Sequence, residues 1–428
     1  MTVEVSMPVV VSKVISKKDK QILRELAEKV AEIAALPVQQ VKAGMWKRLN
    51  GLERVKPMIW IDEIPWHEMD VNGELELKTE DEFCRMLETG LRQTIYQWEH
   101  MRGDMVVEPK IYCPLVIYDT GFGISEDVDI VRTDEKSSII SRHFHPQIQE
   151  EKDIEKIKMP EVVYDTEATE HNYQQMVNIF DGILTVEKRG APGFWFAPWD
   201  ELIRWWGVQE AMTDLVLRPE LVHKAMDRLV EAYLRRLDQY EELNLLSLNN
   251  NNTRIGSGGY GYTDELPQPG YDPARIRAAD LWGCAAAQIF SEVSPEMHEE
   301  FALKYEIRWL KRFGLNYYGC CEPLHKKIGI LKQIPNLRKI SMSPWVNVEE
   351  GAANIGNKYV FSYKPSPAIF ATDAWDPEAA RAQLVSALEK TRGCVVEVIM
   401  KDISTVRYQP QRLWEWTEMA AQVAEDFA

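Results

Sequence analysis

The sequence has no long hydrophobic run and no excess of positive charge. None of its 428 residues belongs to a run approaching the roughly 20 apolar residues that cross a bilayer, and no early segment has the charged-then-apolar order of a secretory signal. The 50 Lys and Arg residues are outnumbered by 67 Asp and Glu residues, for a formal net charge of −17. This balance disfavours nucleic acids and anionic membranes as partners. We therefore expect a cytoplasmic protein that binds neither nucleic acid nor membrane.

Cysteine is also scarce, with six residues in the chain. Only Cys320 and Cys321 lie together, and the other four are scattered: Cys84, Cys113, Cys284 and Cys394. Adjacent cysteines seldom bridge each other, and a cytoplasmic chain keeps its thiols reduced. The cysteines are therefore expected to be free thiols or ligands rather than a disulfide framework.

From about residue 181 the sequence alternates short apolar runs with segments long enough for helices, which is typical of βα units. The runs cover residues 183–186, 194–197, 245–248, 285–290, 315–318, 337–342, 359–362 and 394–400. Eight runs predict a (β/α)8 TIM-type barrel over residues 181–428, with a doubly wound α/β sheet as the alternative. The stretch 249–279, rich in Asn, Gly and Pro, interrupts this rhythm and predicts a long functional loop, either a lid or a partner-docking segment.

The first 180 residues carry helical and strand-like segments of their own. An amphipathic helix is expected over about residues 17–35, and residues 57–63 indicate a buried strand that ends in Asp62 and Glu63. No Gly/Ser-rich or Pro-rich tract separates this part from the rest of the chain. We therefore expect an N-terminal α+β elaboration, residues 1–180, packed on the barrel.

The segment Gly319-Cys320-Cys321-Glu322-Pro323-Leu324-His325 lies where a predicted strand turns into a helix. In α/β proteins, ligands bind outside the carboxyl ends of the strands. Thiolate, carboxylate and imidazole all bind zinc, so Cys321, Glu322 and His325 are candidates, with Cys320 pointing the other way if the run stays extended. The alternative is a buried thiol pair, with Glu322 capping the helix and His325 on its surface.

The C-terminal third resembles the uroporphyrinogen decarboxylase superfamily, which also contains corrinoid-dependent methyltransferases. The resemblance rests on three segments, residues 318–324, 335–345 and 359–365, and extends loosely over about residues 180–428. It implies a (β/α)8 barrel, in agreement with the number of apolar runs.

The residues after the first predicted strand separate two branches of that superfamily. Its decarboxylases place an arginine-rich segment there to bind a polycarboxylate, whereas this chain has Asp62, Glu63 and Trp66. Like charges would repel such a substrate. The methyltransferase branch carries a His-x-Cys zinc pattern, in which Cys321 takes the Cys position and Gly319 stands in place of His.

A further similarity points to methyltransferases that demethylate veratrol-type aryl methyl ethers. These are associated with the spacing Glu-x14-Glu-x20-His, which Glu135, Glu150 and His171 reproduce. The similarity implies that these three residues bind a metal. Solvated acids and a surface histidine are the alternative.

Further candidates follow or end predicted strands. Those for proton transfer or orientation are Glu322, Glu397, Lys401 and Asp62, although Glu397 and Lys401 are equally consistent with structural ion pairs. Aromatic residues that could stack on a substrate ring are Trp60, Trp66, Trp195, Trp345 and Tyr363, with core packing as the alternative for each.

The resemblance implies a corrinoid-dependent methyltransferase. It would remove a methyl group from a small substrate, an aryl methyl ether, and pass it to the Co(I) corrinoid of a partner protein, with zinc activating the leaving oxygen. Two alternatives stay open: a decarboxylase of a porphyrinogen-like substrate, and a non-catalytic corrinoid-binding module. Whether the chain is a monomer or a homodimer is open too.

Overall fold

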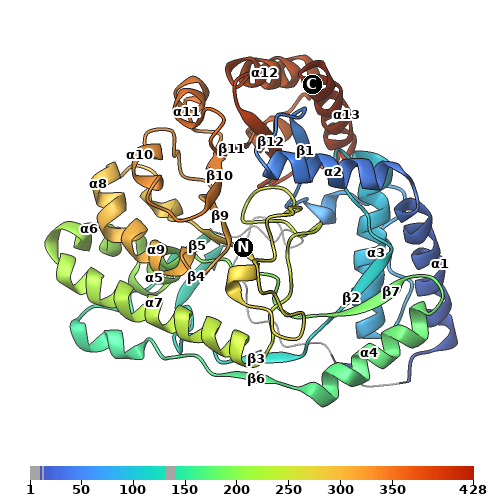
Figure 1. The fold of residues 1–428 in the computed structure, drawn as a ribbon, viewed down its shortest axis with the longest axis horizontal. Coiled ribbons are helices and arrows are strands. Elements are labelled where there is room, and N and C mark those ends of the chain that lie inside the picture. Colours follow the sequence, from blue (N-terminus) through green and yellow to red (C-terminus); the bar gives the residue numbers. More distant parts are fainter. Residues whose placement is uncertain (1–9, 12–13, 132–140) are drawn as a thin grey trace.

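The computed structural model describes residues 10–11, 14–131 and 141–428. A parallel sheet of six strands lies at its centre, in the order β1-β12-β11-β10-β9-β8 (Figure 1). These strands are β1 (Met58–Ile61), β8 (Trp282–Ala285), β9 (Leu315–Tyr318), β10 (Leu337–Met342), β11 (Val360–Tyr363) and β12 (Val395–Met400). Nearly all of their residues are buried, which explains their continuous apolar runs, because parallel sheets are covered on both faces.

The remaining strands form three pairs outside this sheet. β2 (Lys110–Pro114) and β7 (Thr185–Arg189) are parallel, whereas β3 (Ile117–Asp119) with β6 (Val162–Tyr164) and β4 (Val128–Val131) with β5 (Ser141–Phe144) are antiparallel. One isolated bridge, Ala191 to Leu246, continues from the β7 end. The fold is thus mixed α/β with a mostly parallel central sheet. Strand pairing among the described residues does not close a ring, so the TIM-type barrel stays a prediction.

Helices lie around the outside of the strands (Figure 1). The longer ones are α1 (Lys17–Ala34), α2 (Val38–Asn50), α3 (Glu82–Met101), α4 (Thr166–Phe180), α5 (Pro198–Trp206), α6 (Val208–Leu217), α7 (Pro219–Glu242), α11 (Val348–Ile355), α12 (Pro377–Lys390) and α13 (Gln411–Asp426). Shorter ones are α8 (Pro295–His298), α9 (Lys304–Leu310) and α10 (Ile328–Leu331), with a π-helical turn, Glu299–Leu303, joining α8 to α9. Within the described residues, no helix is both long and apolar enough to cross a bilayer.

The central sheet joins the two ends of the chain. β1 pairs in register with β12, for example Met58 with Glu397 and Ile61 with Met400, and α13 packs against β1. The sheet therefore crosses the predicted division at residue 180. The separation into an elaboration and a barrel domain stays a prediction.

Two predicted strands are replaced by another kind of contact. Residues 194–197 form no strand, and residues 245–248 take part only in the isolated bridge at Leu246. Beyond this bridge the side chain of Asn249 substitutes for a strand ladder: its Oδ1 accepts from the Trp282 amide at 2.9 Å, and its Nδ2 donates to the Trp282 carbonyl at 3.0 Å. A side-chain amide can thus satisfy backbone groups that a neighbouring strand would otherwise pair.

The predicted loop 249–279 enters the interior instead of lying over the mouth of the sheet. Ser257 and Tyr260 are buried, and the Asn50 side chain donates to the carbonyls of Tyr260 and Tyr262. In Figure 1 these yellow-green segments pass through the middle of the molecule.

A glycine makes this close approach possible. A Cβ at Gly258 would lie 2.5 Å from Glu397 Oε1 and 2.6 Å from Tyr317 Cε2. Gly258→Ala is therefore expected to lower the free energy of unfolding by about 1–3 kcal/mol, the usual cost of overpacking a core. Chemical denaturation measures the change. Gly329→Ala is the matched control, because a Cβ in α10 meets nothing within 4 Å, and equal stabilities of the two variants would contradict the expectation.

Candidate functional site

The carboxyl ends of the parallel strands bring polar side chains to one edge of the sheet. Glu63 follows β1, Cys320 follows β9, and Lys401 and Asp402 follow β12. Because parallel strands end at a common edge, residues far apart in sequence meet there. The backbone amide of Asp402 donates to Glu63 Oε2 at 3.1 Å, which directly connects the ends of β1 and β12.

A cavity of about 810 Å³ opens at this edge. Its aromatic part is formed by Phe194, Trp195 and Trp282. The polar part combines Glu63, Cys320, Lys401 and Asp402 from the sheet edge with Arg254 and Ser257 from the inserted loop. A largely apolar wall facing a small number of polar groups is the usual composition of a small-molecule site.

Lys401 is the central cation of the polar part. Its Nζ lies 2.6 Å from Asp402 Oδ2, 3.4 Å from Glu63 Oε2 and 3.7 Å from Cys320 Sγ. Burial alone would lower the pKa of Lys401, but the nearby negative groups Cys320, Glu63 and Asp402 raise it above its usual value. The lysine is therefore charged throughout the physiological range.

The surroundings of Glu63 bring its pKa close to neutrality. Burial raises its pKa to about 7, and the carboxyl of Asp402 adds to the increase, while Lys401 opposes it. Asp402 moves in the opposite direction: burial would raise its pKa, but the contacts with Glu63 and Lys401 lower it. The two carboxyl groups thus divide into a proton donor, Glu63, and a carboxylate, Asp402.

Both residues also have strained backbones. Glu63 has φ +51° and Asp402 has φ +57°, in the left-handed region that non-glycine residues rarely adopt. Each such residue costs about 1–3 kcal/mol, and strain of this kind concentrates at functional sites. It turns the chain directly after β1 and β12, where the two side chains meet Lys401.

The two adjacent thiols lie at a sharp turn. β9 ends at Tyr318, and Gly319 has φ +97°, so the chain is no longer extended at the cysteines. As a result Cys320 Sγ and Cys321 Sγ lie 3.5 Å apart, and Cys320 lines the cavity. The condition under which Cys320 would point away from the site, an extended chain, is therefore not met.

Glu322 anchors the same turn. Its carboxylate accepts hydrogen bonds from the amides of Cys320 at 2.9 Å and Ala287 at 3.2 Å, and it is fully buried. Burial raises its pKa. Glu322 does not line the cavity, so its position favours a role in holding the cysteine turn against the end of β8.

A second polar network lies deeper, between the strands. Glu397 pairs with Lys339 at 2.9 Å, both side chains being fully buried, and accepts from Ser362 Oγ at 2.6 Å. Lys364 Nζ donates to Tyr317 Oη at 2.5 Å and to Ser362 Oγ at 2.8 Å. Burial lowers the pKa of Lys364 to about 7. Glu397 is thus held in an internal ion pair, the alternative expected for this residue.

The inserted loop contributes a half-buried guanidinium. Arg254 forms ion pairs with Asp62 and, at 3.5 Å, with Glu63. Its Nε has no hydrogen-bond partner among the described residues. Asp62 is therefore engaged with Arg254, and it does not line the cavity.

The predicted ligands Cys321 and His325 face different neighbours. Cys321 Sγ lies 3.6 Å from Asp402 Oδ2, whereas His325 Nε2 lies 3.8 Å from Glu350 on α11. At the thiol end, the Lys401 ammonium already occupies the space between Cys320, Asp402 and Glu63, where a metal cation would have to bind. Cys321 and His325 therefore do not fit as ligands of one zinc ion.

The second predicted metal set lies in the N-terminal part. Glu135 falls outside the described residues. Glu150 begins a 3-10 turn and pairs with Lys152, and His171 on α4 has its Nε2 3.1 Å from the Val11 carbonyl. Neither belongs to a group of three potential metal-binding side chains among the described residues. Their role as ligands stays a prediction.

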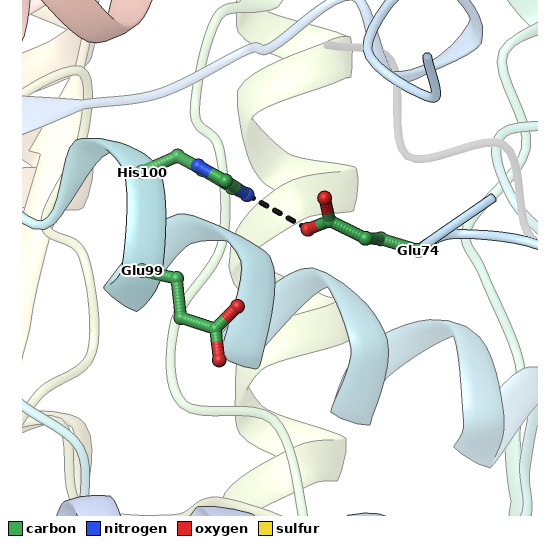
Figure 2. Close-up of side chains that lie close together, drawn as sticks. All are labelled: Glu74, Glu99 and His100. Atoms are coloured by element: carbon green, nitrogen blue, oxygen red, sulfur yellow. Dashed lines mark hydrogen bonds and ion pairs between the residues drawn. The ribbon is translucent and has the colours of Figure 1, made fainter. Parts of the chain in front are cut away.

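One group of three such side chains is found elsewhere, on and beside α3. His100 Nε2 lies 2.7 Å from Glu74 Oε2, and the His100 ring stacks on Trp414. Figure 2 shows the Glu99 carboxylate directed away from this contact. The geometry is that of a histidine–carboxylate pair with a nearby exposed acid.

The predicted aromatic residues are spread over the molecule. Trp195 lines the main cavity, whereas Trp66 lines a separate one and Trp345 is 75% exposed. Trp60 packs against the Tyr260 ring at 4.7 Å, and Tyr363 is half-buried at the end of β11. Of the five, only Trp195 is in the cavity.

The structure adds site residues that the sequence had not singled out as such. Trp282, Cys284 and Arg254 all line the cavity. Trp282 and Cys284 come from β8, of which only the last residue, Ala285, belongs to the apolar run predicted over residues 285–290. Arg254 comes from the loop, where no periodic pattern exists. An apolar run predicted to begin at Trp282 would have identified Trp282 and Cys284.

Comparison with known protein families finds no matching family model. No curated protein matches either. One solved structure that aligns with this chain is a methyltransferase from Methanosarcina mazei, with 13% sequence identity and a TM-score of 0.49, over 89% of this chain and 96% of that chain. No residue role is carried over from it.

Proposed function

We propose that the chain is a methyltransferase that removes the methyl group of a small methylated substrate, an aryl methyl ether, bound in the 810 Å³ cavity. The observation that carries the proposal is the joining in one cavity of an aromatic wall and a carboxyl group, Glu63, whose pKa is raised to about 7. Phe194, Trp195 and Trp282 supply apolar area for an aromatic ring, and Glu63 supplies a proton beside it.

The proton matters because the leaving group is an aryl oxide. When the methyl carbon is taken by a nucleophile, the C–O bond breaks and its electron pair stays on oxygen. Glu63 is placed to donate a proton to that oxygen, and Lys401 balances the resulting Glu63 carboxylate at 3.4 Å. General acid catalysis of this kind contributes typically about 10²- to 10⁴-fold.

The methyl acceptor is inferred from the sequence resemblance: a Co(I) corrinoid, carried by a partner protein, would supply a nucleophile strong enough to attack an ether methyl group. The chain's own part is to bind the ether, orient its oxygen toward Glu63 and keep water out. Such a partner would approach the cavity at the sheet edge.

The charges of the cavity favour this proposal over decarboxylation of a polycarboxylate. Arg254 is matched by Asp62, and Lys401 by Asp402, so no cation is left free in the described cavity to bind several carboxylates. A neutral aromatic ether requires no such excess.

The test is a reconstituted reaction. The purified chain is mixed with a reduced corrinoid protein and a panel of methoxyarenes, and phenol formation is followed by chromatography. Phenol is expected only when both proteins are present. Binding is measured separately, by quenching of tryptophan fluorescence on adding each methoxyarene. If no methoxyarene binds or yields a phenol while uroporphyrinogen is decarboxylated, the proposal fails in favour of the decarboxylase.

A further inference from the structure

The adjacent thiols form a pair of which one member, Cys320, lines the cavity. Cys320 Sγ and Cys321 Sγ are 3.5 Å apart, and Cys321 is half-buried. Neither thiol has a role in the methyl-transfer proposal. A small molecule that enters the cavity meets Cys320.

The environments of the two sulfurs differ in a way that assigns them different states. The contact with the Cys321 sulfur lowers the pKa of Cys320, and Lys401 at 3.7 Å adds to this, against the effect of burial. The same contact raises the pKa of Cys321, and burial raises it further. Cys320 lines the cavity beside a cation, whereas Cys321 donates to the Asp402 carboxylate at 3.6 Å, so the geometry favours a thiolate at Cys320 and a proton on Cys321. An accessible thiolate beside a second thiol is the arrangement of redox-active cysteines.

We propose that Cys320 is a site of thiol–disulfide exchange with small organic disulfides, and that Cys321 is the resolving thiol that completes a vicinal disulfide. This inference does not depend on the methyl-transfer proposal. It rests on the sulfur–sulfur distance, the cavity and the contacts with Lys401 and Asp402.

The exchange takes place in two steps, each of which breaks one bond to sulfur as it forms another. The Cys320 thiolate attacks one sulfur of R–S–S–R, a new S–S bond forms, the original one breaks, and RS⁻ leaves. Cys321 then gives its proton to Asp402, attacks Cys320 Sγ and expels the second RS⁻, which receives the proton from Asp402. The cysteine pair has lost two electrons, and the small disulfide has gained them.

The turn that holds the pair makes the product easy to reduce. The Cys320 carbonyl accepts from Ser341 Oγ at 2.6 Å, and the Cys320 amide is bound to Glu322. Closing a ring between adjacent residues requires the intervening peptide to move against these bonds. Strained disulfides are the labile ones, so the modification is expected to be reversible by a dithiol.

A third thiol, Cys284, can be compared with Cys320 within the same cavity. Cys284 also lines it, but its thiol donates to the Phe194 carbonyl at 3.2 Å, and burial raises its pKa to about 11. The other three cysteines, Cys84, Cys113 and Cys394, are buried. Access to the cavity is therefore shared by two thiols, of which only Cys320 has a cation beside it that stabilises a thiolate.

The experiment treats the full-length protein with 2-hydroxyethyl disulfide at neutral pH and follows intact mass and peptide maps with time. The parent is expected to lose the mass of two hydrogens, with the new bond between Cys320 and Cys321, and to recover it with dithiothreitol. Cys321→Ser should instead retain one mixed-disulfide adduct on Cys320. Cys320→Ser should react about tenfold or more slowly, because only the thiolate attacks, and Cys113→Ser, at a buried thiol outside the cavity, should match the parent.

Peptide maps of the parent keep the test independent of variant folding, which circular dichroism checks for each variant. First modification at Cys284 or Cys321 would overturn the assignment of Cys320. A lasting mixed disulfide on Cys320 in the parent would overturn the resolving role of Cys321. Each of these results can occur whether or not methoxyarenes are demethylated, so the two proposals fail separately.

Discussion

Lys339→Met is expected to lower the free energy of unfolding by about 3–5 kcal/mol, the usual cost of leaving one member of a buried ion pair without its partner. Lys339 and Glu397 are both fully buried and 2.9 Å apart. Methionine fills a similar volume and preserves the contacts with Trp46 and Trp282, over whose rings the lysine lies. The loss therefore reports the stranded Glu397 carboxylate. Denaturant unfolding measures it.

Two controls separate this effect from loss of packing. Lys339→Met combined with Glu397→Gln removes both charges and should recover much of the loss, which a double-mutant cycle expresses as a coupling energy. Lys18→Met breaks the ion pair with Glu80, whose two side chains are 62% and 79% exposed, and should leave stability unchanged. A single variant as stable as the parent would mean that Glu397 takes up a proton or another partner at no cost.

Glu63→Gln is expected to reduce the rate of phenol formation by about 10²- to 10⁴-fold, because glutamine retains the shape but carries no acidic proton. The pH dependence has a definite sign. Glu63 acts in its protonated form, and its pKa is raised to about 7. The parent's rate should therefore be constant at lower pH and fall as the pH rises through about 7, and the variant should lose this fall.

The measurement is the initial rate of phenol formation over a pH series, with methoxyarene binding measured in parallel. Binding should change little in Glu63→Gln, so the loss should lie in kcat. Glu350→Gln is the control, since Glu350 lies on α11 beside His325, outside the cavity. A variant with the parent's rate and pH profile would remove Glu63 from the reaction and leave the proton source unassigned.

Sequence patterns predicted most of the central strands, but not the bounds of β8, and they predicted the site only in part. β9 and β10 have the predicted bounds, Leu315–Tyr318 and Leu337–Met342, because a strand covered on both faces must be apolar throughout. The α12 helix, Pro377–Lys390, has equally local signals at its start, because Asp376 caps it and Pro377 begins it. An apolar run and a helix-capping residue are signals carried by neighbouring residues, and signals of this kind can be read from a single sequence.

The remaining features depend on contacts between distant residues. The alternation rule would place Cys320 away from the site only if the chain stayed extended, and the positive φ of Gly319 ends the extended segment before Cys320. The sequence around Arg254 shows neither helix nor strand periodicity, and the position of Arg254 depends on a loop that passes through the interior. Glu322 was assigned to catalysis or capping by its position before a helix, whereas α10 begins only at Ile328 and the carboxylate binds the amides of Ala287 and Cys320.

The pairing of β1 with β12 also determines when the site comes into existence during synthesis. The hydrogen bond from Asp402 to Glu63 joins residues separated by 339 positions, so the acid emerges from the ribosome long before its partners. Until β12 is made, β1 has neither its neighbour in the sheet nor Lys401 to balance its carboxylates. The nascent chain is therefore expected to contain no functional cavity until nearly the whole sequence is translated, and a truncated product would lack the site entirely.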